Sequence, residues 1–308
     1  MQTLFSYTLA TPITFGTLTM VPLLAPRTSE PDYDTLDAAL AAGALSVTEV
    51  SDAGHVPEIR VVNKGTRPVL IIDGEELVGA KQNRTVNISI LVPAAAEVLV
   101  PVTCVEAGRW RARSRGFSSS SRVHFAAGRA AKSRQVSESL LLRGRAVADQ
   151  GEVWAAISEK AQRMQVNSST SAMSDIFEGH AASVDAYASA LAPVEGQVGA
   201  GFLIDNEPRG LDLFAHPSTC RALLPKIVRG YAIDAIERHA ARNPGVVSAG
   251  ADALRARTVA LADTILRSPR QQFPSIGAGE TWRLAGGQVS GGALTQNDEL
   301  LHLSAFPA

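Results

Sequence analysis

The chain between Glu58 and Val105 consists of short β-type runs in direct succession, with no helical pattern among them. The runs are rich in Val, Ile, Leu and Thr and are separated by Gly, Pro, Asn and Asp, as in strands joined by tight turns. Asp73-Gly74, between two of the runs, predicts a two-residue hairpin turn because a type I′ turn needs positive φ at both positions. The predicted strands are Ile59–Val62, Val69–Ile72, Glu75–Val78, Thr85–Val92 and Val98–Val105.

Helical patterns dominate the middle of the chain. Apolar residues recur at helical spacing from about Gln135 to Gln165, with an interruption near Gly151. Strands followed by helices, without regular βαβ alternation, predict an α+β fold. We expect a β-rich N-terminal half built as an antiparallel or mixed sheet or a sandwich, helices in the middle and C-terminal half, and a C-terminal β meander. The further predicted elements are helices at Ala181–Leu191, after His216-Pro217-Ser218-Thr219 and at Ala251–Arg267, a strand pair at Val198–Ile204 and Gly210–Phe214, and the meander from Thr281 to Phe306.

The preferred domain organisation is a single integrated α+β domain over residues 1–308. The alternative subdivision has a β-rich part at 1–108, a basic loop at 109–134, and a helical part with C-terminal strands at 135–308. No internal repeat separates these parts.

Composition limits the class of protein. The hydrophobic share of 45% and the charged share of 19% are globular values and exclude a wholly disordered chain. Two distant cysteines, Cys104 and Cys220, do not make a disulfide framework. The N-terminus lacks a basic region before an apolar core, and no stretch approaches ~18 uninterrupted apolar residues. We therefore expect a soluble, cytoplasmic, bacterial-type protein with no membrane partner.

Common cofactor motifs are not found in the sequence. There is no GxGxxG that opens a helix and no GxxxxGK[ST], so Rossmann and P-loop interpretations fail. No pair of histidines has metal-ligand spacing, and no metal site is predicted. The cofactor is left undetermined, as is the oligomeric state.

The segment from Gly74 to Trp110 carries the strongest functional signal, because it is unusually polar for a region between β runs. Arg offers a planar fork that suits carboxylate or phosphate, and Gln and Asn can donate and accept at once. The second half of the segment ends a strand and releases an Arg and a Trp into a loop, where a Trp can stack on a flat ring. The expected ligand-binding residues are Lys81, Gln82, Asn83, Arg84, Arg109 and Trp110, the expected catalytic residues are Glu75 and Glu106, and Cys104 is a candidate nucleophile.

A purely structural interpretation of the same residues stays open. Glu75 and Glu76 flank a predicted turn, where exposed carboxylates solubilise a sheet edge, and Lys81 and Arg84 can be their salt-bridge partners. Cys104 can be a small buried hydrophobe, and the Trp a core anchor. The clustering of so many polar groups on two neighbouring β segments favours function for the group as a whole.

These residues resemble a known family. Gly74-Glu75, Gly79-Ala80-Lys81-Gln82-Asn83-Arg84 and Cys104-Val105-Glu106-Ala107-Gly108-Arg109-Trp110 are similar to motifs of the ARG- and rhodanese-phosphatase-superfamily-associated protein domain. Gln150-Gly151-Glu152-Val153-Trp154 and Gly210-Leu211-Asp212-Leu213-Phe214 fit too. The family's name reflects genomic association with ADP-ribosylglycohydrolase-type and phosphatase-type proteins. The resemblance implies a link to NAD- or ADP-ribose-linked metabolism and no settled reaction.

The basic stretch supplies a further hypothesis. Arg109 to Arg145 contains ten Lys or Arg residues and one acidic residue, Glu138, and its Ser118–Ser121 run predicts a loop. Arg residues interleaved with aromatics suit the phosphates of a small ligand, or of nucleic acid bound through 109–134. The alternative is a solvated loop.

Three functions follow. The first is an enzyme acting on a phosphorylated, nucleotide- or ADP-ribose-like small molecule, with Glu75 or Glu106 as a base. The second is a noncatalytic ligand-sensing or protein-interaction module, and the third is nucleic-acid binding. Whether the chain is an enzyme is left open.

Overall fold

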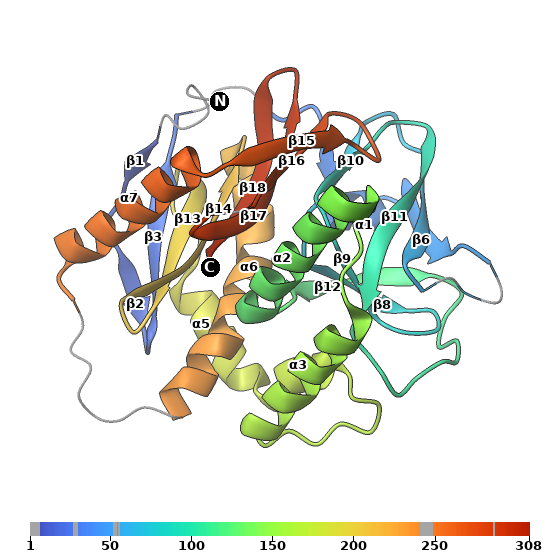
Figure 1. Cartoon of the computed structure of the whole chain (residues 1–308), viewed down its shortest axis with the longest axis horizontal. Coiled ribbons are helices and arrows are strands. Elements are labelled where there is room, and N and C mark those ends of the chain that lie inside the picture. Colours follow the sequence, from blue (N-terminus) through green and yellow to red (C-terminus); the bar gives the residue numbers. More distant parts are fainter. Residues whose placement is uncertain (1–6, 27–29, 52–53, 55, 241–248, 286) are drawn as a thin grey trace.

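The α+β class is confirmed by the computed structural model, which describes residues 7–26, 30–51, 54, 56–240, 249–285 and 287–308 (Figure 1). The described part has a β-rich N-terminal half, helices in the middle, and a C-terminal β meander, as the sequence predicts. Within the described residues, no helix combines the length and the apolar composition that a membrane span requires.

The largest sheet has nine strands, and all its pairs are antiparallel. It joins strands from the start of the chain to strands from the second half, so its core forms only after distant segments meet. Its path is β1 (Thr8–Leu9), β3 (Leu18–Leu24), β13 (Gln197–Ile204), β14 (Glu207–Phe214), β18 (Glu299–Pro307), β17 (Val289–Gln296), β16 (Glu280–Leu284) and β15 (Arg270–Pro274), with β2 (Ile13–Phe15) beside β3.

Two smaller sheets form the other half of the β structure. Every pair in them is antiparallel except β4 with β7. The six-stranded sheet runs β12 (Phe117–Val123), β8 (Glu75–Gly79), β9 (Arg84–Val86), β11 (Ala96–Cys104), β6 (Glu58–Asn63) and β5 (Leu45–Glu49). The three-stranded sheet runs β10 (Ile90–Val92), β7 (Val69–Ile71) and β4 (Asp34–Thr35).

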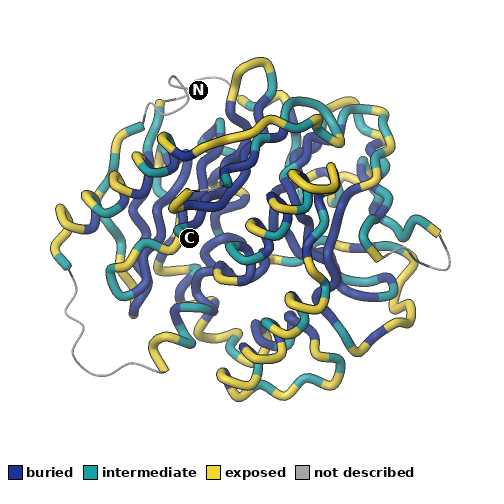
Figure 2. Tube along the Cα trace, in the orientation of Figure 1, coloured by how far each residue is buried: buried dark blue, intermediate teal, exposed yellow. Residues whose placement is uncertain are grey.

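The helices fill the space around and between the sheets. α6 packs on β13 of the large sheet and on β12 of the six-stranded sheet (Figure 1). Most of its residues from Thr219 to Ala235 are buried, as expected for a helix that lies largely in the interior (Figure 2). Pro225 lies inside α6. The helices are α1 (Leu36–Ala41), α2 (Ala126–Arg143), α3 (Gln150–Arg163), α4 (Met173–Gly179), α5 (Ala181–Ala190), α6 (Pro217–Ala240) and α7 (Ala251–Arg267).

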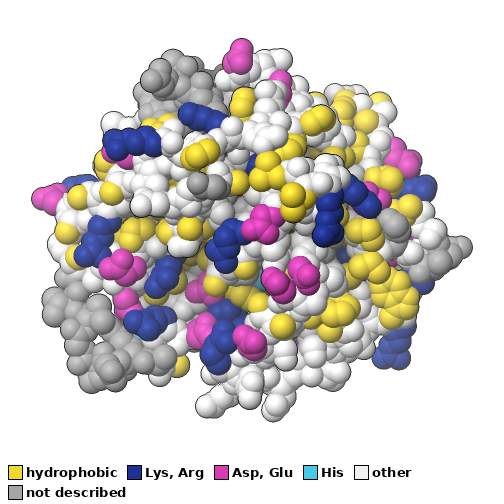
Figure 3. Space-filling model, viewed as in Figure 1, with side chains coloured by type: hydrophobic (Ala, Val, Ile, Leu, Met, Phe, Trp, Pro, Cys, Tyr) yellow, Lys and Arg dark blue, Asp and Glu magenta, His cyan; other side chains and the backbone are white. Residues whose placement is uncertain are grey.

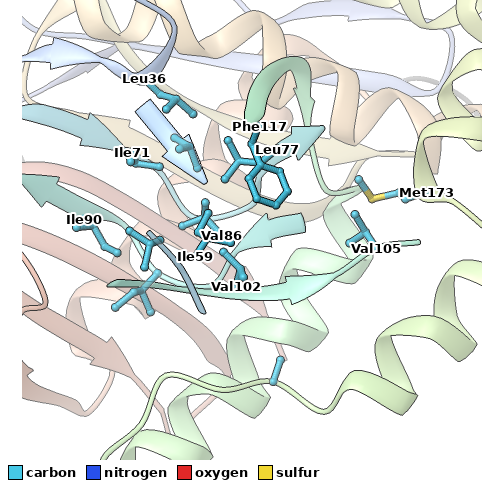
Figure 4. Packing of buried hydrophobic residues seen from close by; sticks show 14 of the residues in the cluster. Leu36, Ile59, Ile71, Leu77, Val86, Ile90, Val102, Val105, Phe117 and Met173 are labelled. Atoms are coloured by element: carbon cyan, nitrogen blue, oxygen red, sulfur yellow. The ribbon is translucent and has the colours of Figure 1, made fainter. Parts of the chain in front are cut away.

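An aliphatic core supports the six-stranded sheet (Figure 4). Leu77, Val86 and Val102 lie on adjacent strands β8, β9 and β11, and Phe117 packs beside Leu77. Each is 6% exposed or less. This core fixes the strands that carry the polar motifs.

The predicted hairpin at Asp73-Gly74 is wrong. β7 pairs with β10 and β4, whereas β8 pairs with β12 and β9, so the chain crosses here from one sheet to another. Gly74 does have a positive φ of 86°, but Asp73 does not, and it is only 3% exposed. A Cβ on Gly74 would lie 2.8 Å from the Arg129 side chain. The positive φ and the close approach of that arginine both favour glycine at this crossing.

One further prediction about local structure is wrong. The Ser118–Ser121 run lies within strand β12. Its serines do not form a core face, and backbone pairing of β12 with β8 holds the strand instead. The predicted interruption of the helical region near Gly151 is confirmed, because residues 144–149 separate α2 from α3 and Gly151 lies in the first turn of α3. α2 ends at Gly144, with φ of 64°, and α3 begins after Asp149, whose side chain caps the helix.

A buried network of charges connects the two halves of the β structure through α2. The Arg129 guanidinium on α2 lies 2.8 Å from Asp212 on β14 and 3.7 Å from Asp73 at the sheet crossing. Lys132, one turn later, lies 3.2 Å from Asp73. Burial would raise the pKa of Asp212, but Arg129 and hydrogen bonds from His302 and Arg129 hold that pKa below its ordinary value. All these carboxylates therefore remain ionised and paired.

Replacing Asp212→Asn is expected to lower the free energy of unfolding by about 3–5 kcal/mol, because it leaves the Arg129 charge buried without its main partner. Urea unfolding followed by circular dichroism measures this. The control is Asp252→Asn, since Asp252 is 99% exposed in its pair with Arg255 and should leave the midpoint unchanged. Equal midpoints for the two variants would show that the network does not stabilise the fold.

His124 makes stability depend on pH. Burial, reinforced by Lys132, lowers the pKa of His124 to about 3 from 6.5. The unfolded chain therefore binds a proton that the folded chain does not, and stability is lost as pH falls below 6.5. Between about pH 6 and pH 4.5 we expect a loss of about 1.4 kcal/mol per pH unit, absent in His124→Gln. His239→Gln, at an exposed site, should keep the slope; an unchanged slope in His124→Gln would contradict the assignment.

Candidate functional site

The polar motifs meet where β9 and β11 pair. Arg84 is directly opposite Cys104 in the register, and Leu77 of β8 is directly opposite Arg84. Because paired residues of antiparallel strands point to the same face, the arginine and cysteine side chains lie together. The motif that contains Arg84 and the motif that begins at Cys104 are therefore in contact.

Arg84 is fully buried, and part of its guanidinium has no hydrogen-bond partner. Its Nη1 donates to Gln82 Oε1 at 2.9 Å and to the Cys104 sulfur. Its Nη2 lies 3.8 Å from Glu49 Oε1, too far for a hydrogen bond. Among the described residues, Nε and Nη2 of Arg84 and Oε2 of Glu49 are buried without any hydrogen-bond partner. Such atoms are rare in native structures and point to a missing ligand or water.

Trp110 covers this arginine. Its indole is 49% exposed, and the ring centroid lies 5.6 Å from Arg84 Cζ and 5.6 Å from Lys81 Nζ. Both distances are within the range of cation–π attraction. The aromatic side chain is thus held over two cations by a weak interaction, on the solvent side of the cluster.

Glu106 and Arg109 form the base of the loop that carries Trp110. Arg109 Nη2 lies 2.6 Å from Glu106 Oε2, which also accepts from the Asn83 backbone N–H at 3.2 Å, while Thr170 donates to Oε1 at 2.9 Å. Arg109 donates further to Asn83 Oδ1 and to the Ala80 carbonyl. Burial opposes ionisation of Glu106, but its donors lower the pKa below its ordinary value. The ion pair between Glu106 and Arg109 therefore stabilises the loop that carries Trp110.

Cys104 is buried at the centre of the cluster. The side chain of Gln150 at the start of α3 accepts from the Cys104 backbone N–H at 2.9 Å and donates to its carbonyl at 2.8 Å. Burial raises the pKa of the Cys104 thiol to about 11, and Glu49 acts in the same direction, while Arg84 opposes the rise. The thiol is protonated at neutral pH.

Glu75 and Glu76 have partners of their own, which they share with neither Arg84 nor Glu106. Glu75 accepts from the Ile72 backbone N–H at 2.9 Å and pairs with Lys226 of α6 at 2.8 Å. Glu76 lies 2.5 Å from the Arg122 guanidinium on β12. Both carboxylates are fully buried. The alternative that these two carboxylates are exposed and solubilise a sheet edge is therefore wrong.

Three residues of the cluster were missed by sequence reasoning. Glu49 lies on β5, far from both motifs in sequence, and no local pattern marks it. Thr170 is in a Ser/Asn/Thr-rich segment that predicts only a loop. Gln150 belongs to a stretch that supported the family resemblance, and that resemblance was its only signal.

The basic stretch 109–134 does not form one loop. Arg109, Arg129 and Lys132 are buried in ion pairs, and Arg122 is half-buried between Glu76 and Glu178. Its exposed cations are Arg111, Arg113, Arg115 and Arg134. No group of three or more His, Cys, Asp or Glu in the described part of the chain is arranged to hold a metal ion.

The model of the ARG and Rhodanese-Phosphatase-superfamily-associated Protein domain matches residues 6–306. The chain belongs to this family. The resemblance carried by the two motifs is therefore confirmed, and the match covers almost the whole chain. No curated protein and no solved structure matches the chain significantly. The family description names neither a reaction nor a ligand.

Cys104 is expected to react slowly with alkylating agents. With a pKa near 11, fewer than about one thiol in a hundred is ionised at pH 8, and the sulfur is buried. Iodoacetamide should modify Cys104 at least about a hundredfold more slowly in the native protein than in urea. Peptide mass spectrometry measures the two rates. Rapid native labelling would contradict the protonated state and favour a nucleophilic role.

Proposed function

We propose that this chain binds a phosphorylated, nucleotide- or ADP-ribose-like small molecule at Arg84, beneath Trp110. The observation that carries the proposal is the partly unpaired guanidinium of Arg84, which is fully buried and faces one distant carboxylate, Glu49. An uncompensated buried cation is costly, and an anionic ligand would supply the missing acceptors.

Phosphate suits this site better than a point anion. The guanidinium fork can donate two parallel hydrogen bonds to phosphate oxygens, and Lys81 adds a second positive charge beside the indole. Trp110 would move from the cation to the ring of the ligand, because base–aromatic stacking replaces the cation–π contact. A half-exposed side chain can make this move without disturbing the core.

The remaining motif residues take supporting roles in this proposal. Gln82 orients Arg84 by accepting from its Nη1 and donating to the Glu106 carbonyl at 2.8 Å. The loop that carries Trp110 is held by Asn83, Arg109 and Glu106, so that the indole lies against Arg84. The ligand contacts are thus assigned to Arg84, Lys81 and Trp110.

If the ligand is processed, Glu49 is the carboxylate best placed to act as a base. Its Oε2 has no hydrogen-bond donor among the described residues, whereas both oxygens of Glu75 and of Glu106 accept from donors. A base needs a free lone pair directed at the reacting proton. Glu75 and Glu106 would then not touch the reacting atoms. They would only hold neighbouring groups in position.

Titration with ADP-ribose is expected to change the emission of Trp110. The change should be absent in Trp110→Phe, which retains Trp154 and Trp282. Arg84→Gln should need at least about ten times more ADP-ribose, because a charge-assisted phosphate contact is lost. Lys81→Gln, at a half-buried site, serves as a second variant if Arg84→Gln does not fold. Arg113→Gln, an exposed arginine of the same loop, should titrate like the native chain.

The same titration decides between the enzyme and the sensing module. Chromatography of the incubated ADP-ribose shows turnover, and its loss in Glu49→Gln with binding retained would identify the base. Saturable binding without turnover identifies a noncatalytic ligand-binding protein. A Trp110 emission that stays constant up to millimolar ADP-ribose would reject the proposed site.

A further inference from the structure

A groove of about 830 Å³ lies on the face of the molecule that carries α2, α3 and α6 (Figure 3). Its floor is made by small and apolar residues, among them Ala126 and Ala130 of α2 and Ile204 of β13. Its size is within the range of pockets that hold nucleotide-sized molecules. We call it the Arg134 groove, after the α2 residue at its edge.

Four arginines line the groove, and two of them are already engaged. Arg163 pairs with Glu237, and Arg238 lies 2.8 Å from Asp205. The other two, Arg134 on α2 and Arg209 on β14, are exposed and make no ion pair or hydrogen bond within the described part of the chain.

The acidic residues of the groove do not neutralise these two arginines. Asp234 on α6 lies 2.6 Å from Lys160 and accepts from the Ala127 backbone N–H at 2.7 Å. Glu237 pairs with Lys160 and Arg163. The two carboxylates are therefore compensated by the buried Lys160, by Arg163 and by the first turn of α2. Among the charged side chains that line the groove, Arg134 and Arg209 are those without a charged partner in the described part of the chain.

We propose that the Arg134 groove is a second ligand site, which takes an organic phosphate. The phosphate would bind Arg134 and Arg209, and the organic part would lie on the floor at Ala126 and Ala130. The two guanidinium forks match phosphate oxygens, and the apolar floor favours a phosphate ester over a free inorganic anion. This site shares no residue with the Arg84 cluster and does not depend on the function proposed there.

Nucleic acid fits the groove less well. Backbone binding needs a continuous basic surface along a strand, because each neutralised phosphate adds to affinity. Here the lining of the groove contains the carboxylates Asp234 and Glu237 as well as the two free cations. A compact anion avoids these carboxylates and an extended polyanion does not.

Isothermal titration of the full chain with ADP tests the site. Because Arg134 and Arg209 are exposed, the double variant Arg134→Gln with Arg209→Gln should fold normally and bind ADP at least about tenfold more weakly. Arg143→Gln is the matched control, since Arg143 is an exposed arginine of the same helix and does not line the groove. Inorganic pyrophosphate should bind more weakly than ADP.

The outcomes separate this proposal from the first one. Loss of ADP binding in the double variant, with binding retained in Trp110→Phe and Arg84→Gln, supports the groove, whether or not ADP-ribose binds at the Arg84 cluster. Loss only in Arg84→Gln assigns ADP to the Arg84 cluster and overturns the groove. Native-like binding in the double variant, no binding by the native chain, or pyrophosphate that binds as tightly as ADP also overturns it.

Discussion

The ion pair between Arg129 and Asp212 is the contact on which the arrangement of the sheets depends. It is fully buried, and it joins α2 to the large antiparallel sheet while the same arginine approaches Asp73 at the crossing between the two smaller sheets. A buried charge without its partner costs several kcal/mol, so the pairing strongly disfavours other ways of docking α2. Gly74 is the residue that lets the backbone pass this side chain.

The position of the Arg84 cluster follows from that crossing. Asp73 and Gly74 direct the chain into β8, and β8 sets the register of β9, which carries Arg84. β11 then places Cys104 opposite it, and the salt bridge of Glu106 with Arg109 fixes the loop above. Most polar side chains of the segment are used in holding this geometry. The unpaired guanidinium edge and the half-exposed indole are the features that such a structural role does not explain.

Both proposed sites contain arginine, but their surroundings differ. Arg84 is buried under an aromatic ring, whereas Arg134 and Arg209 stand at the edge of an open groove. Desolvation strengthens each hydrogen bond at the first site, and solvent screening weakens the charges at the second. The Arg84 cluster is therefore suited to selecting one ligand, and the groove to binding a broader class of organic phosphates.

The sequence by itself determined the α+β class, the family, most helices and strands, and the two motifs, because periodicity, turn residues and short runs are local signals. It also placed the two motifs on neighbouring β segments, and the strands that carry them are paired in the structure. It failed at Asp73-Gly74, where the residue types are those of a hairpin turn but the chain crosses between two sheets beside a buried arginine of α2. Only the tertiary structure showed that Glu49 faces Arg84, that Glu75 pairs with Lys226, and that Arg134 and Arg209 share a groove. These pairings join residues distant in the chain, and packing of the sheets around α2 and α6 decides them.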